Sequence, residues 1–127
     1  MKADLKNWLD SAQYDLETAE QMAGAGRYIY TVFMCHLALE KLLKARVLET
    51  TGKTPPKTHD LSYLVSLSHL SPAEEVKNIL AEISNLSVVT RYPTDFQKMH
   101  KDFSRERAES ILARTTEVFL WIRKHIK

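Results

Sequence analysis

The chain has 127 residues, of which 44% are hydrophobic and 27% are charged, and its formal net charge at pH 7 is +2. This length corresponds to one domain over residues 1–127, and the composition is typical of a globular protein with a modest core. The small net charge argues against a basic protein that coats polynucleotides, and the lack of an apolar run of about 18 residues argues against a membrane-spanning helix.

Two long helices are predicted in the first part of the chain. Apolar residues recur at spacings of three and four over residues 5–23, which is one face of an amphipathic helix that ends at the glycine-containing segment 24–26. A second helix is predicted over residues 27–51, and Gly52 ends it. Its apolar stripe is broad, so we expect this helix to contact several helices or a second protomer.

A short helix and a third long helix are predicted after the proline-containing connector at 52–58. Thr58 or Asp60 can cap the short helix. The sequence SPAE at 71–74 then combines a capping serine, a proline at the first helical position and a glutamate three residues after the cap. This pattern predicts the start of the third long helix, which should end before Pro93.

The last helix is predicted to begin near residues 102–104 and to extend almost to the end of the chain. The segment 93–102 is interpreted as a loop, and no strand-like alternation of useful length competes with the helices. The sequence therefore predicts an all-α fold, an up-and-down helical bundle of four long helices and one short helix.

The single cysteine and the N-terminal sequence predict a cytoplasmic protein. Cys35 cannot form an internal disulfide, and the charged N-terminus MKADLKNWLD lacks the apolar segment of a secretory signal. Cys35 also lies in an apolar stretch, so we interpret it as a buried structural thiol and not as a nucleophile.

The histidines do not form a recognisable metal-binding pattern. His36 and Glu40 are four residues apart on the second predicted helix, but the local sequence HLALE is not the HExxH pair of a zinc enzyme. We predict no metal and no cofactor, and we interpret His36 as a hydrogen-bonded, partly buried histidine. A P-loop is also missing, because GKT at 52–54 lacks its first glycine.

Glu40, Lys41 and Lys44 allow two interpretations. Glu40 precedes Lys44 by four residues, which is the favourable order for an ion pair on a helix surface. Alternatively, the two lysines border a groove that binds an anion.

Four segments resemble the HEPN family (higher eukaryotes and prokaryotes nucleotide-binding domain). They are WLDSAQYDL at 8–16, GRYIYTVFMCHLALEKLLKA at 26–45, TGKTPPKTHDL at 51–61 and TRYP at 90–93. The resemblance implies a helical bundle that commonly forms a homodimer. It also implies a prokaryotic protein that often has a small nucleotidyltransferase as its partner, as in toxin–antitoxin systems. Many members of the family are metal-independent ribonucleases that use an Arg-x(4–6)-His motif in the dimer cleft.

This chain departs from the ribonuclease motif. No arginine is followed by a histidine at that spacing, because eight residues separate Arg91 from His100 and position 96 is Phe96. RNA cleavage without a metal needs a group that moves the proton of the 2′-hydroxyl and a cation that stabilises the phosphorane. Arg91 can supply the charge, but His100 can move the proton only if the segment 93–102 folds back.

Arg91 and Tyr92 also allow two interpretations. In the structural one, Pro93 ends the helix, Tyr92 packs, and Arg91 pairs with Asp95 or Asp60. In the functional one, Arg91 binds a phosphate and Tyr92 stacks on a base or sugar. The anion site would then include Lys41, Lys44 and His59.

The hypothesis that we favour is a HEPN accessory protein, a homodimer that binds a nucleotide or partners a minimal nucleotidyltransferase and has no nuclease activity. The second and last helices would form the dimer surface, because both offer broad apolar faces. One alternative is a divergent metal-independent ribonuclease, an RNA-cleaving toxin that uses Arg91 and His100. The other is a non-catalytic interaction module whose basic last helix meets an acidic partner.

Overall fold

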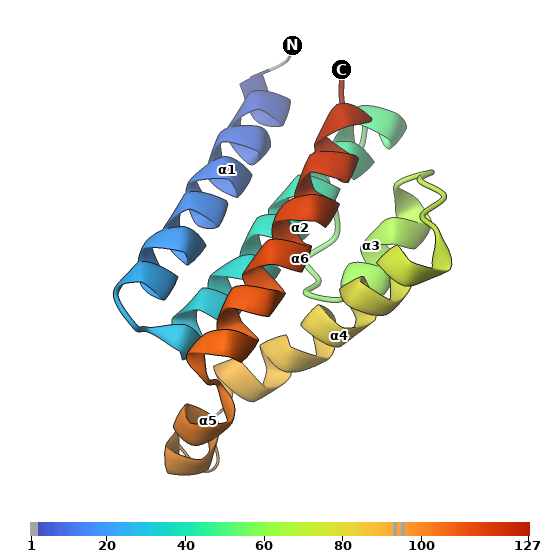
Figure 1. Cartoon of the computed structure of the whole chain (residues 1–127). Helices are drawn as coiled ribbons and strands as arrows, with labels where there is room; N and C mark the ends of the chain where they lie inside the picture. Colours follow the sequence, from blue (N-terminus) through green and yellow to red (C-terminus); the bar gives the residue numbers. More distant parts are fainter. Residues whose placement is uncertain (1–2, 93, 95) are drawn as a thin grey trace.

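The structure, a computed structural model, describes residues 3–92, 94 and 96–127. Within these ranges the chain forms helices and no strand (Figure 1). In chain order they are α1 (Ala3–Gly24), α2 (Tyr28–Thr51), α3 (Leu61–Leu67), α4 (Glu74–Arg91), α5 (Phe96–Asp102) and α6 (Arg105–Lys124).

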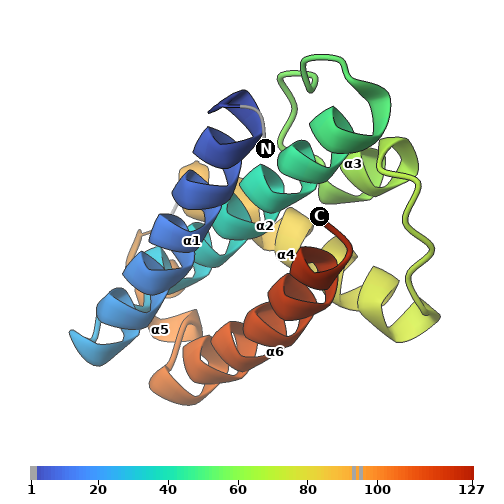
Figure 2. The same ribbon diagram turned by 90° about the horizontal axis from the view of Figure 1, so that it is seen from above.

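The long helices alternate in direction, as in an up-and-down bundle. α1 begins and α6 ends at the same end of the molecule, while α4 crosses at an angle to these two (Figure 1). Seen from above, α2 lies between α1 on one side and α3 and α4 on the other (Figure 2). The predicted all-α bundle is therefore confirmed.

The predicted number of helices is wrong, because the segment expected to be a loop contains the short helix α5. Its apolar residues fall at helical spacing: Met99 follows Phe96 by three residues and precedes Phe103 by four. Met99 and Phe103 are buried in the core. This short apolar face stabilises about two turns of helix against the bundle, and the bundle thus has two short helices instead of one.

α2 is the central helix, because it contacts all five other helices. Its apolar stripe is therefore used within the chain, and several of its side chains are completely buried, among them Leu39, Leu42 and Leu43. The prediction that this helix contacts several neighbours is confirmed. The same finding removes the reason for placing a dimer surface on α2.

The helix ends agree with the predicted caps except at α4. Asp60 and Ser104 accept hydrogen bonds from backbone N–H groups in the first turns of α3 and α6, and Gly52 ends α2 in the left-handed conformation with φ of 70°. α4, however, begins at Glu74 after an extended Ala73 that makes no side-chain cap, so the predicted capping by Ser71 is wrong. Pro72 is buried in the preceding segment, which delays the start of the helix.

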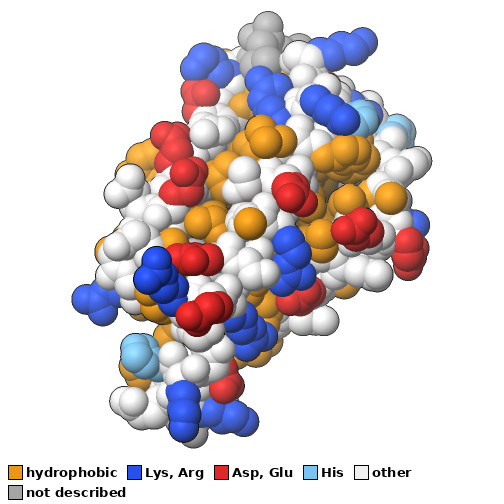
Figure 3. Space-filling model, in the orientation of Figure 1, with side chains coloured by type: hydrophobic (Ala, Val, Ile, Leu, Met, Phe, Trp, Pro, Cys, Tyr) orange, Lys and Arg blue, Asp and Glu red, His pale blue; other side chains and the backbone are white. Residues whose placement is uncertain are grey.

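The surface in view carries positive and negative side chains close together (Figure 3).

None of the helices in the described part of the chain is both long and apolar enough to cross a membrane.

Candidate functional site

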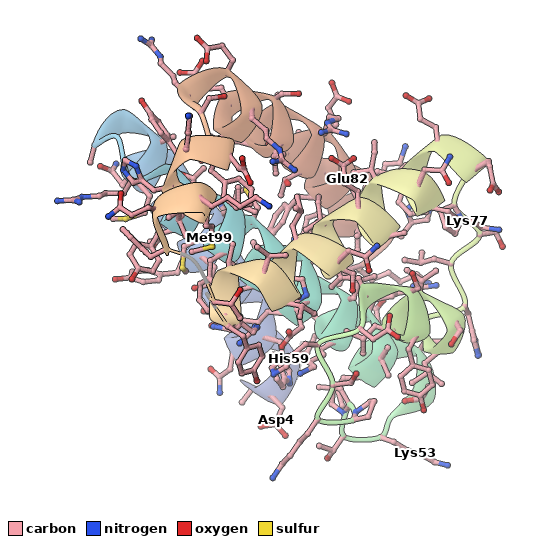
Figure 4. The ribbon with its side chains drawn as sticks, turned by 90° about the horizontal axis from the view of Figure 1, so that it is seen from below. Asp4, Lys53, His59, Lys77, Glu82 and Met99 are labelled. Carbon is pink, nitrogen blue, oxygen red and sulfur yellow. The ribbon has the colours of Figure 1, made fainter. Side chains whose placement is uncertain are left out.

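Five polar side chains from three elements meet at one side of α2, and we call them the Glu40 cluster. α2 contributes His36, Glu40 and Lys44, which follow one another at a spacing of four residues and so lie on one face of the helix. The connector between α2 and α3 contributes His59, which Figure 4 labels, and the last turn of α4 contributes Arg91. The three residues of α2 are all buried.

Glu40 is the centre of this cluster. Its Oε1 accepts a hydrogen bond of 2.8 Å from Nδ1 of His59, and its Oε2 accepts one of 3.0 Å from Nζ of Lys44. Burial acts to raise the pKa of Glu40, but the hydrogen bonds from His59 and Lys44 outweigh it and hold the pKa below the ordinary value. The carboxylate is therefore ionised at neutral pH, and Lys44 balances its charge.

His36 fastens the connector to α2. Its Nε2 lies 2.7 Å from the backbone oxygen of His59, so Nε2 must carry the proton and donate. Burial lowers the pKa of His36, against the raising effects of this hydrogen bond and of Glu40, and the ring is neutral. The remaining nitrogen, Nδ1, has no hydrogen-bond partner and lies 3.8 Å from Oε1 of Glu40. His36 is hydrogen-bonded as predicted, but it is completely rather than partly buried.

Arg91 is held in place without using all its hydrogen-bond donors. Its guanidinium lies over the ring of Phe33, 4.8 Å from the ring centroid, and its Nη2 is 4.0 Å from Oε1 of Glu40. Nε and Nη2 are buried and have no hydrogen-bond partner among the described residues. The structural interpretation paired Arg91 with Asp95 or Asp60. Among the described residues the carboxylate near Arg91 is that of Glu40, so the pairing with Asp60 is wrong.

The structural interpretation of Arg91 also involved Tyr92, Pro93 and Asp95, of which the structure describes only Tyr92. Tyr92 follows α4 directly and is 71% exposed, so its ring does not pack in the core. Pro93 and Asp95 lie outside the described residues.

The two lysines are both engaged inside the chain. Nζ of Lys44 is 5.7 Å from the ring centroid of Trp8, and Lys44 is buried, so its pair with Glu40 is not the surface pair that one interpretation expected. Lys41 turns towards α1, where its Nζ lies 2.8 Å from Asp15 and donates to Ser11. Their charges are thus matched by carboxylates of this chain.

His100 lies in a different environment from Arg91. It is exposed on α5, where its ring packs against Phe96 at a centroid distance of 5.9 Å. It lines a cavity of about 370 Å³, the α5 cavity, together with Tyr30, Thr90 and Met99 among others. Arg91 is not among the residues that line this cavity, although its neighbour Thr90 is.

A second hollow, the His59 cavity, lies between the start of α3 and α4. It has a volume of about 320 Å³, and most of the residues that line it have polar side chains, although polar and apolar atoms share its surface about equally. The residues that line it are His59, Asp60, Ser62, Ala81, Ser84, Asn85, Ser87 and Val88. His59 therefore belongs both to the Glu40 cluster and to the wall of a cavity large enough for part of a ligand.

The described residues give no support to a cysteine nucleophile or to a metal site. Burial raises the pKa of the Cys35 thiol to about 11, although a hydrogen bond with Thr115 acts in the opposite direction, so the thiol is protonated at neutral pH. No group of three or more His, Cys, Asp or Glu side chains suited to a metal ion occurs in the part of the chain that the structure describes.

Sequence reasoning missed the central role of Glu40. It considered this residue only as a partner of Lys44 or His36. A signal was present, because three polar residues at a spacing of four interrupt the apolar stripe of α2 on a single face. A polar stripe in a helix that is otherwise buried indicates partners from other elements, but it does not say which ones.

Comparisons with known proteins identify the family. The model of the HEPN domain matches residues 5–125, so the chain belongs to the HEPN family. Two solved structures are similar to it. One is the crystal structure of TT1696 from Thermus thermophilus, with 18% identity, a TM-score of 0.80 and coverage of 97% of this chain and 98% of that chain. The other is ST0689, an archaeal HEPN homologue, with 19% identity, a TM-score of 0.77 and complete coverage of both chains. No curated protein matches the chain.

Proposed function

We propose that this HEPN protein is a cytoplasmic accessory protein that binds a nucleotide through Arg91 and Tyr92 and has no nuclease activity of its own. The observation that carries the proposal is the state of Arg91, whose guanidinium is positioned on Phe33 while two of its nitrogens, Nε and Nη2, have no hydrogen-bond partner among the described residues. A buried donor that lacks a partner costs about 1–3 kcal/mol. Both nitrogens are buried and the side chain as a whole is 19% exposed, so a phosphate group that removes this cost requires a movement of the Arg91 side chain towards it.

The surroundings of Arg91 favour an anion over further pairing within the chain. Among the described residues Glu40 is the carboxylate close to Arg91, and its oxygens already accept hydrogen bonds from His59 and Lys44. Phe33 covers one face of the guanidinium and limits its orientations. A planar guanidinium held in this way suits a phosphate, to which it can make two parallel hydrogen bonds.

Tyr92 supplies the second part of the proposed site. Its ring is exposed directly after Arg91. Stacking of a base on an aromatic side chain contributes about 1–3 kcal/mol and needs no particular base. Arg91 and Tyr92 would thus bind a phosphate and a base of one ligand.

The proposal includes a homodimer and a partner nucleotidyltransferase, as in toxin–antitoxin systems. An exposed apolar surface is available for either at the end of α4, where Val88, Val89 and Tyr92 are 60%, 46% and 71% exposed. Leu120 on α6 is also exposed.

The ribonuclease alternative requires Arg91 and His100 to act on one phosphate. His100 packs on Phe96 in the α5 cavity, whereas Arg91 packs on Phe33 beside Glu40. These different packing partners support the non-nuclease proposal, because the general base and the cation must both reach one phosphate and its neighbouring hydroxyl.

The proposal is tested by isothermal titration calorimetry with ATP on the parent protein and on Arg91→Gln. We expect the variant to bind ATP about 10- to 100-fold more weakly, as for a lost hydrogen bond to a charged group. Arg105→Gln is the matched control, because Arg105 is exposed and pairs with Glu109 on its own helix.

Three results would contradict the proposal. Unchanged ATP binding by Arg91→Gln would exclude Arg91 from the site. RNA cleavage without divalent metal that is lost in His100→Ala would favour the ribonuclease. No binding of ATP at millimolar concentration, together with capture of an acidic protein, would favour the interaction module.

A further inference from the structure

The α5 cavity differs from the His59 cavity in the character of its wall. Its volume is about 370 Å³, and apolar atoms form most of its surface. Aromatic side chains are prominent among the described residues that line it, namely those of Tyr28, Tyr30, Phe96 and Phe103. Ligand sites are commonly cavities of about 300–1,000 Å³ with mostly apolar and aromatic walls and a few polar groups. The α5 cavity thus has the size and the wall of a site for a small apolar molecule.

The wall of the α5 cavity is built from three parts of the chain. The turn before α2 and the first turn of α2 contribute one part, the end of α4 contributes Thr90, and α5 with the residues that follow it contributes the third part. Met99 of α5, which Figure 4 labels, lies in the core together with Ile29 and Phe103. The inner part of the cavity is therefore apolar and rests on the packed bundle.

Two aromatic residues of the wall are open to solvent. Tyr30 and Phe96 are 58% and 54% exposed, although both line the cavity. Phe96 packs against the ring of His100 with a centroid distance of 5.9 Å. Aromatic rings pack favourably on one another in offset-stacked and edge-to-face arrangements, so exposed rings beside an apolar hollow suit a flat ring of a ligand. The wall therefore favours an aromatic ligand over an aliphatic one.

The charge at the cavity favours an anion. Arg27 and His100 are the basic residues among the described residues that line it, and none of these residues carries a carboxylate. Arg27 is exposed and forms no ion pair with a carboxylate of the described residues. A guanidinium is charged at neutral pH and can bind both oxygens of a carboxylate through two parallel hydrogen bonds. A ligand that satisfies both the wall and the charge has a carboxylate attached close to an aromatic ring.

We infer that the α5 cavity binds a small aromatic carboxylate, whose ring packs among the aromatic side chains of the wall and whose carboxylate pairs with Arg27. This site is separate from the proposed nucleotide site, because Arg91, Tyr92 and His59 are not among the described residues that line the α5 cavity. The inference therefore goes beyond the proposed function and adds a second ligand of a different chemical class.

The test uses indole-3-acetate as the probe and its neutral amide, indole-3-acetamide, as the comparison. Each compound is titrated into isotope-labelled protein, and the backbone amide resonances in heteronuclear NMR spectra report where it binds and how tightly. We expect a dissociation constant on the order of 1 mM for indole-3-acetate, as for a molecule of this size. The shifts should centre on residues 26–30 and 96–104, which line the cavity. The amide should bind about 2- to 5-fold more weakly, as for the loss of one ion pair that solvent reaches.

Arg27→Gln tests the contribution of the charge. Glutamine keeps a long polar side chain but removes the positive charge, so the variant should bind both probes equally, at the level of the amide in the parent protein. Lys53→Gln is the matched control, because it removes an exposed positive charge just beyond the opposite end of α2 (Figure 4). This control should keep the preference for indole-3-acetate.

Phe96→Ala tests the contribution of the aromatic wall. We expect it to weaken the binding of both probes by about 3- to 10-fold, as for the loss of one aromatic contact. Tyr63→Ala is the matched control, because Tyr63 is a 48% exposed aromatic residue on α3 that is not among the residues lining this cavity. Circular dichroism checks that each variant is folded as the parent protein is.

Four results would overturn the inference. No shift of the lining amides at millimolar indole-3-acetate would exclude the ligand and leave the proposed nucleotide binding intact. A preference for the acetate that persists in Arg27→Gln would exclude the pairing with Arg27. Displacement of indole-3-acetate by ATP would place both ligands at one site. Shifts of the same amides on dilution of the free protein would show that a second copy of the chain covers the cavity.

Discussion

The Glu40 cluster and the region around α5 are stabilised by different kinds of contact. In the cluster, charged and polar groups from α2 and the connector are joined by hydrogen bonds of 2.7 to 3.0 Å, and Arg91 of α4 lies 4.0 Å from Glu40. Around α5, Met99 and Phe103 are buried among apolar side chains, and His100 packs on Phe96. Figure 4 labels one residue of each region, His59 on the connector and Met99 on α5.

This difference teaches which region can recognise a polar ligand. Hydrogen bonds fix the directions of the side chains from α2 and the connector, whereas Arg91 is held over Phe33 and has two nitrogens without a partner among the described residues. Apolar packing around α5 fills space without fixing donors or acceptors, so a residue such as His100 is free to change its orientation at the surface. The cluster is the better candidate for a site with defined chemistry, and the two regions should respond differently to mutation.

The largest expected effect is the loss of the carboxylate in the cluster. Glu40→Ala leaves Lys44 buried without its charge partner, and we expect the free energy of unfolding to fall by about 3–5 kcal/mol. Urea denaturation followed by circular dichroism measures this change. The double variant Glu40→Ala/Lys44→Met should recover part of the loss, since it removes the unpaired charge. A single variant as stable as the parent protein would show that the cluster is not held by charge.

The next effect concerns the α5 region. Met99→Ala removes a buried side chain from α5, and we expect a loss of about 2 kcal/mol, at the low end for such a change because α5 is a short helix at the edge of the bundle. Binding of ATP should be unchanged after correction for the unfolded fraction. A selective loss of ATP binding would connect the two regions and would favour the alternative that uses His100.

The smallest effect is a dependence of the free energy of unfolding on pH, caused by His36 and Glu40 of the Glu40 cluster. Burial lowers the pKa of His36 from 6.5, so below pH 6.5 the unfolded chain takes up a proton there that the folded chain refuses. Stability should therefore decrease as the pH falls below 6.5, by at most about 1.4 kcal/mol per pH unit for one proton. The lowered pKa of Glu40 adds a further loss below pH 4.5, because the contribution of an ionised carboxylate disappears on protonation.

The variant His36→Gln isolates the histidine in this dependence. The amide nitrogen of glutamine can replace Nε2 as the donor to the backbone oxygen of His59, but glutamine does not titrate. Unfolding measured between pH 7 and pH 5 should be nearly independent of pH in the variant. A slope that is the same in both proteins would assign the dependence to another group.

Much of the fold could be predicted because helix patterns are local. Gly52, Asp60 and Ser104 end or cap helices as expected, since a cap depends on residues within one turn. The prediction at Ser71 was wrong, although the local pattern was good, because the buried Pro72 and the extended Ala73 shift the start of α4 to Glu74. α5 was missed because its apolar face is only a few residues long and gains its stability from the core that it contacts.

The candidate site could be predicted only in part. Arg91, Tyr92 and His59 were named on the basis of the HEPN resemblance, and Arg91 and His59 do lie around one carboxylate. Lys41 and Lys44 were named with them, but they pair with Asp15 and Glu40 inside the chain. Whether a lysine serves an anion site or a buried ion pair depends on the carboxylates that the fold brings near it, and these come from other helices or other turns.

By itself, the sequence determined the helical class of this protein, most of its helix ends and its HEPN family, because periodicity, caps and motifs are properties of neighbouring residues. Only the tertiary structure decided that Glu40 binds His59 and stands beside Arg91, at sequence separations of 19 and 51 residues. Contacts over such separations follow from how the whole core packs, so no local pattern records them.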